Sequence, residues 1–170
     1  MALSKIQDAG VALTAAAIPV LNSSSMPAGS VLQVVQGSSS TFVINNTSTY
    51  ADTGLTASIT PSSASSKVLI QASLPFQLGT NGGNGQLQFR IVRDSTSLVS
   101  NLSVNNVQYI VQLSLVQNLI WLDSPSTTSA TTYKIQFREL NMSGRYGNSA
   151  VIPAWNDSQT GVIQVMEIAG

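Results

Sequence analysis

The chain has 170 residues, 43% of them hydrophobic, which is enough for one domain with a sizeable core. Only 8% are charged, against roughly 25% in ordinary soluble domains, and seven basic residues balance seven acidic ones, so no basic stripe exists for nucleic acid. The absence of cysteine and histidine excludes disulfides, Ser-His and Cys-His hydrolases, and zinc sites that need thiolate or imidazole ligands.

The low charge has two compatible interpretations. Burying a hydroxyl or an amide costs much less than burying a charge, so a surface of Ser, Thr, Asn and Gln suits a protein that lives inside an assembly. A net charge of zero also leaves little repulsion between copies. The same composition equally describes any Ser/Thr-rich β-protein, and we weight the two interpretations alike.

Residues 1–29 are expected to form an N-terminal arm and linker, ahead of a single β-domain over 30–170. The arm is too short and too interrupted, by Pro19, to span a membrane, and we predict no targeting signal. Its apolar residues are candidates for an assembly interface, with packing against the chain's own domain as the alternative. These residues are Leu3, Ile6, Val11, Leu13, Ile18 and Val20.

From Ser30 onward the hydrophobic period is two, which predicts strands. Inward faces are expected at Val68, Ile70, Ala72 and Leu74, at Leu87, Phe89 and Ile91, and at Tyr133, Ile135 and Phe137. The predicted strands cover 31–35, 41–44, 67–74, 86–93, 133–138 and 161–168. Clusters of Gly, Ser, Pro and Asn separate them. Short alternating strands at regular spacing predict an all-β fold, an antiparallel sandwich or barrel.

The stretch 107–121 is longer and changes from alternation to the continuous apolar run Leu119-Ile-Trp-Leu122. It predicts either two strands or one long strand that passes into a fully buried environment. We assign the apolar run to the core, with a subunit contact as the alternative.

No constellation predicts catalysis, a cofactor or a metal ion. The glycine-rich loop 79–85 lacks the helix and lysine of a phosphate site and is expected to be a hairpin tip. A glycosidase needs two carboxylates in a cleft, but the aspartates at positions 52, 94, 123 and 157 adjoin Gly, Ser or Thr and are assigned to turns. Most aromatic residues are expected in the core; Tyr146 and Trp155 are the candidates for a ligand platform.

Several stretches together resemble a module found in tail-fibre and other virion proteins of marine phages and cyanophages. They include Gly29-Ser-Val-Leu-Gln-Val-Val-Gln36, Arg90-Ile-Val-Arg-Asp-Ser-Thr96 and the ending Val165-Met-Glu-Ile-Ala-Gly170, with the longer runs 50–70 and 122–138. The resemblance implies a jelly-roll-like β-sandwich that forms trimers and carries no catalytic residues.

In tail fibres such a module usually follows a longer chain, whereas about 29 residues precede it in this sequence. We therefore expect a non-enzymatic phage structural protein, made in the host cytoplasm and placed on the virion surface. The preferred role is a trimeric capsid decoration (cement) or head-fibre protein that docks on the major capsid protein or another virion protein. The alternative is a tail-fibre tip that binds a host-surface glycan. No membrane partner is expected.

Overall fold

The computed structural model describes residues 25–45, 47–78, 84–108, 113–140, 150–151 and 159–170. In these ranges the chain consists of β-strands joined by short turns, with every pairing antiparallel. The strands are β1 (Val31–Ser39), β2 (Val43–Ile44), β3 (Ala51–Ile59), β4 (Lys67–Leu78), β5 (Asn84–Arg93), β6 (Thr96–Gln108), β7 (Leu113–Asp123), β8 (Thr131–Leu140), β9 (Ala150–Val151) and β10 (Gly161–Ile168).

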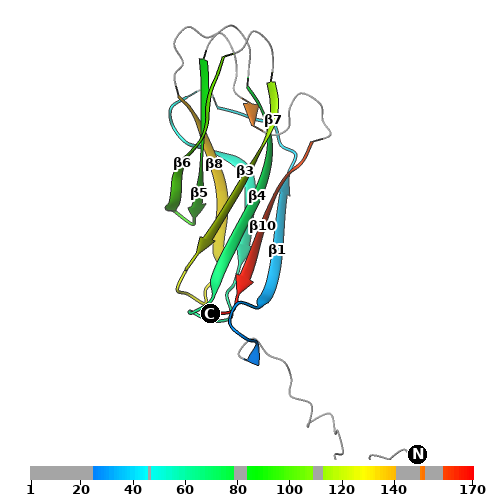
Figure 1. Cartoon of the computed structure of the whole chain (residues 1–170), viewed down its shortest axis with the longest axis vertical. Helices are drawn as coiled ribbons and strands as arrows, with labels where there is room; N and C mark the ends of the chain where they lie inside the picture. Colours follow the sequence, from blue (N-terminus) through cyan, green and yellow to red (C-terminus); the bar gives the residue numbers. More distant parts are fainter. Residues whose placement is uncertain (1–24, 46, 79–83, 109–112, 141–149, 152–158) are drawn as a thin grey trace, which may run out of the picture.

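The strands form two sheets that pack face to face (Figure 1). The long strands of sheet A run in the order β1-β10-β4-β7, and the short β9 and β2 extend this sheet beside one end of β4. Sheet B has the order β3-β8-β5-β6. The first long strand pairs with the last, and the chain crosses repeatedly between the sheets, which is the jelly-roll arrangement. The predicted antiparallel sandwich is confirmed.

The core lies between the sheets and follows the predicted alternation. Phe76 and Phe89 meet edge to face across it, with ring centroids 5.7 Å apart. All of the predicted inward faces are buried, including the fully enclosed Tyr133 and Phe137. The pattern succeeds here because each central strand buries one face and exposes the other.

At one side of the sandwich β1 and β3 come very close together. A Cβ atom added to Gly37 would overlap the backbone carbonyl of Thr56 on β3. Opposite this contact β3 is irregular, since its register with β8 shifts between Asp52 and Thr56 and Gly54 has φ of +83°. The hydroxyl of Thr53 donates to the Ile135 carbonyl at 2.8 Å and so keeps this irregular segment attached to β8. Glycine is therefore required at Gly37 for space and at Gly54 for its backbone conformation.

Several sequence predictions need correction. The predicted hairpin at 79–85 is wrong, because β4 and β5 belong to different sheets; residues 84–85 belong to β5, and residues 79–83 lie outside the described residues. Strand β3 was not predicted, because its inward positions include the small residues Thr53 and Ala57, which give a weak hydrophobic signal. Asp52 and Asp123 lie in strands instead of turns, whereas Asp94 does occupy the β5–β6 turn, with φ of 51°.

The stretch 107–121 belongs to two strands, β6 and β7, as one of the two alternatives predicted. Asp157 lies outside the described residues.

One carboxylate is buried at the end of the core where the chain enters and leaves the sandwich. Glu167 accepts hydrogen bonds from the Gln33 side chain at 2.6 Å and from the amide and hydroxyl of Ser62, both at 2.7 Å. Burial alone raises the pKa of Glu167, but these donors outweigh burial and hold the pKa below its ordinary value. The ionised carboxylate therefore joins β1, β10 and the segment that follows β3.

This site predicts an acid-sensitive contribution to stability. Because the folded pKa of Glu167 is lowered, its contribution is complete above the unfolded pKa of about 4.3 and is lost as the pH falls through the folded value. In Glu167→Gln, the new side-chain amide faces the amide of Gln33, which donates to the carboxylate in the natural chain. We expect the free energy of unfolding at pH 7 to fall by about 1–2 kcal/mol. Urea unfolding at pH 7 and at about pH 3.5 should show a smaller pH effect in E167Q than in the wild type. Equal pH effects in both proteins would contradict this assignment.

Candidate interaction surface

The outer face of sheet A combines apolar and amide side chains, which align in rows across four strands. Pairing places Val34 opposite Met166, Met166 opposite Leu69 and Leu69 opposite Leu122. We call these four residues the apolar row. Val34 is 54% exposed and Leu122 50%. Val31 and Ile168 pair beside this row and extend it toward the end of the sheet.

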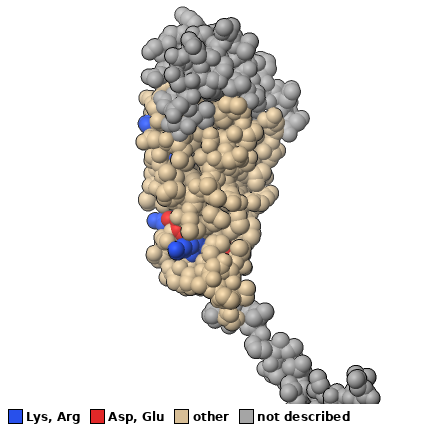
Figure 2. All heavy atoms as spheres, viewed as in Figure 1, with Lys and Arg blue, Asp and Glu red and all other residues tan. Residues whose placement is uncertain are grey.

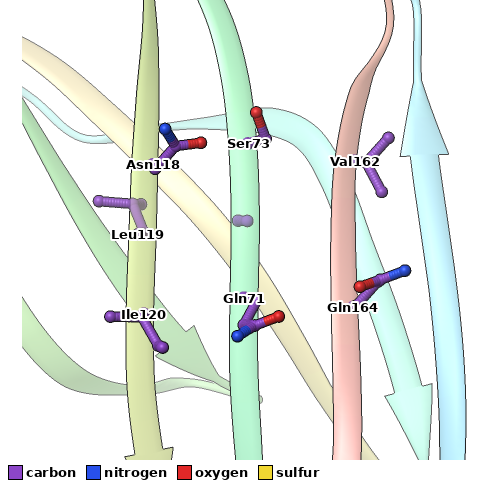
Figure 3. A pocket seen from close by; sticks show the side chains of 8 residues that line it. Gln71, Ser73, Asn118, Leu119, Ile120, Val162 and Gln164 are labelled. Carbon is purple, nitrogen blue, oxygen red and sulfur yellow. The ribbon is translucent and has the colours of Figure 1, made fainter.

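Amide side chains form the next row, which runs through Gln36, Gln164 and Gln71 and ends at Ile120. The Gln164 side chain donates to that of Gln36 at 2.9 Å. A shallow depression of about 420 Å³ lies beside Gln71 and Gln164, and Figure 3 shows that its lining comes from the neighbouring strands β7, β4 and β10. The surface is thus apolar at one level and hydrogen-bonding at the next.

Charge is nearly absent from this face. Among its described residues, Lys67 at the start of β4 is the one charged side chain. Figure 2 shows the consequence, since the middle of this face is almost all uncharged, and the coloured atoms lie along the left margin and across the lower part of the domain. Apart from Lys67 at the start of β4, no described charge would therefore oppose burial of this face against another protein.

The outer face of sheet B is polar and carries a charged network. Lys134 lies 3.1 Å from Asp52, which also accepts a bond of 2.6 Å from the Gln136 amide. The guanidinium groups of Arg90 and Arg138 stand 4.1 and 4.5 Å from the centre of the Tyr50 ring. The two outer faces of the sandwich are therefore chemically distinct, and the low charge of sheet A makes it the candidate interaction surface.

The apolar run at the end of β7 is mostly on the surface, which corrects its assignment to the core. Leu119 is buried, but Ile120 is 64% exposed, Trp121 39% and Leu122 50%. β7 is the last strand of sheet A and pairs only with β4 among the described strands. Because none of the described strands covers its other side, apolar residues on both of its faces are exposed.

A buried ion pair joins β7 to sheet B beneath this surface. The Arg93 guanidinium lies 2.8 Å from Asp123, whose carboxylate also accepts a 2.8 Å bond from the Tyr133 hydroxyl. The Asp123 side chain is only 8% exposed. Burial and the bond to Asp123 raise the pKa of Tyr133 above its ordinary value, so the hydroxyl remains a donor. The arrangement is structural, since all three groups satisfy one another.

The residues predicted as sites fall elsewhere. The arm residues Leu3, Ile6, Val11, Leu13, Ile18 and Val20 lie outside the described residues, as do Tyr146 and Trp155. Sequence reasoning missed the outer face of sheet A, because its rows combine single residues from four strands. The described part of the chain has no group of three or more acidic side chains placed to hold a metal ion. It also has no helix long and apolar enough to cross a membrane.

Comparisons with known proteins give only distant similarities. No protein-family model matches the chain, and no curated protein is significantly similar to it in sequence. Among solved structures, T=1 particles derived from infectious bursal virus have 14% identity and a TM-score of 0.41, covering 81% of this chain and 36% of theirs. The VP2 subviral particle of infectious bursal disease virus has 13% identity and a TM-score of 0.42, covering 81% of this chain and 37% of its own.

Latent PorU from Porphyromonas gingivalis has 7% identity and a TM-score of 0.35, covering 84% of this chain and 14% of its own. The chain thus spans little more than a third of the viral proteins, and less of PorU. These values are too low to place the chain in a family.

Proposed function

We propose that this chain is a non-enzymatic structural protein of a bacteriophage particle, a trimeric capsid decoration or head-fibre protein that docks on the capsid surface. The observation that supports it best is the outer face of sheet A, which carries the apolar row and, among its described residues, no charge except Lys67 at its end. Such a face suits a protein repeated in many copies, because a contact centred on the apolar row buries apolar area and little charge. The resemblance of residues 29–170 to phage virion modules is the reason for proposing a phage particle as the assembly.

In this proposal the two parts of the chain have different roles. The domain over 30–170 presents sheet A to its neighbour, while residues 1–29 reach adjacent virion subunits through their apolar side chains. The described part of this junction is firmly attached, since the Gly29 amide donates to the Ala169 carbonyl at 2.8 Å and the Ala169 amide to the Ser30 carbonyl at 2.8 Å. Multiple weak contacts of this kind add up to stable attachment when they act together.

The test is where the protein sits on the particle. Immunogold electron microscopy of intact phage, with antibody raised against this chain, should place gold over the head. Gold confined to the tail would overturn the decoration role and favour the alternative, a tail-fibre tip that binds host-surface glycan. Absence of the protein from purified particles would reject both roles.

A charge placed in the apolar row should weaken attachment to the particle. Val34→Lys changes a side chain that is already half exposed, so the fold should be retained. Burying the new ammonium group is costly, and we expect at least about a tenfold loss of binding to particles that lack the protein. Thr56→Lys, on the exposed face of β3 in the other sheet, is the matched control. Equal binding by both variants would exclude the sheet A face as the docking surface.

A further inference from the structure

The free edge of β7 differs from the other three edges of the sandwich. The register of β1 is interrupted between Val31 and Gln33, that of β3 shifts near Gly54, and the β5–β6 ladder shifts three times. By contrast, β7 follows β4 through eleven consecutive pairs without a shift. Bulges and charges are the usual means of preventing one edge strand from pairing with another. β7 has neither over 113–122 and contains no proline.

Apolar side chains on both faces of β7 are exposed to solvent. Val116, Ile120 and Leu122 lie on the outer face and are 50–64% exposed, while Leu115 and Trp121 on the opposite face are 36% and 39% exposed. Within the described part of the chain, β7 is an edge strand with apolar groups on both faces and no strand on its outer side. Adding one further strand would bury both sets and pair the free backbone groups.

We propose that the occupant of this edge is β7 of a second copy, paired antiparallel about a two-fold axis at Asn118. In that register Asn118 faces Asn118 of the partner subunit, Val116 faces the partner's Ile120, and Leu115 faces the partner's Trp121. Apolar groups thus meet at one named pair on each face, whereas the same register sets Leu119 against the partner's Gln117 and Leu122 against the partner's Ser114. The two Asn118 amides can bond to each other. No charged residue of 113–122 stands in the contact.

This inference goes beyond the proposed function and does not depend on it. A two-fold contact at β7 is additional to any trimer and would link two trimers side by side. The Arg93–Asp123 pair holds the end of β7 against sheet B and thereby presents the edge in a fixed position.

Cysteine cross-linking tests the register directly, because the natural chain has no cysteine and a single introduced thiol can pair only with its copy. Asn118→Cys places two thiols across the axis, within the span of a disulfide. Under mild oxidation we expect a covalent dimer on non-reducing gels. Gln36→Cys, exposed on β1, should remain uncross-linked on the same gels. If both variants form dimers at equal rates, the cross-links come from random collision and the inference is wrong. If Asn118→Cys forms no dimer, the inference is also wrong.

A second variant tests the contact without cross-linking. Ile120→Lys puts two ammonium groups into the paired edges, and we expect the dissociation constant of the two-fold contact to rise at least about tenfold in sedimentation or light scattering. Thr56→Lys, on the edge strand of the other sheet, should leave it unchanged. If Ile120→Lys associates like the wild type, the edge is not the contact. Gold on the capsid together with uncross-linked Asn118→Cys would reject this inference and leave the proposed function standing.

Discussion

Replacement of Asp123 by alanine should lower the free energy of unfolding by about 3 kcal/mol. The substitution removes the carboxylate that pairs with Arg93 and accepts from the Tyr133 hydroxyl. It leaves the buried Tyr133 hydroxyl without this acceptor and leaves Arg93 only its long 3.4 Å bond to the Ser124 carbonyl. Breaking a buried pair costs about 3–5 kcal/mol, and we take the low end because the Arg93 side chain is 25% exposed. For a chain of this size the midpoint of thermal unfolding should fall by roughly 6–12 °C.

A matched control is the ion pair on the outer face of sheet B. The side chains of Lys134 and Asp52 are 30% and 55% exposed, so Asp52→Ala should cost no more than about 1 kcal/mol. Urea unfolding of both variants measures the difference. Amide hydrogen exchange shows which part of the fold is destabilised, since loss of Asp123 should increase exchange in β7 more than in β8. Similar losses of stability for the two variants would mean that burial does not set the strength of these pairs.

Replacement of Gly37 by alanine should cost about 3 kcal/mol, at the upper end of what overpacking usually costs. The added Cβ would overlap the Thr56 carbonyl, and a backbone atom of a paired strand cannot move aside as the tip of a flexible side chain can. β1 and β3 would have to separate, and that separation would loosen the closed side of the sandwich.

The neighbouring Ser38 provides the comparison for this effect. Its side chain is exposed on the outer face of β1, and Ser38→Ala should change stability by less than about 0.5 kcal/mol. Chemical denaturation of the two variants tests the prediction. A Gly37→Ala variant as stable as Ser38→Ala would show that the two strands tolerate greater separation.

The sequence alone predicted those features that depend on neighbours along the chain. The alternation of Tyr133, Ile135 and Phe137 with polar residues identified β8 and its buried face, because successive side chains of a strand point to opposite sides. Low charge and the lack of histidine and cysteine pointed away from common catalytic chemistry. Strand β3 escaped prediction because small inward residues give little periodic contrast.

Only the tertiary structure decided which strands are central and which are edges. Ile70 and Ile120 occupy similar apolar stretches, yet Ile70 on the central strand β4 is fully buried and Ile120 on β7 is 64% exposed. Strand order depends on contacts between residues far apart in the chain, as when Val34, Met166, Leu69 and Leu122 join in one row. No local pattern contains that information. The sequence therefore determined the strands and their inward faces, while the sheet order created the apolar face and the free edge.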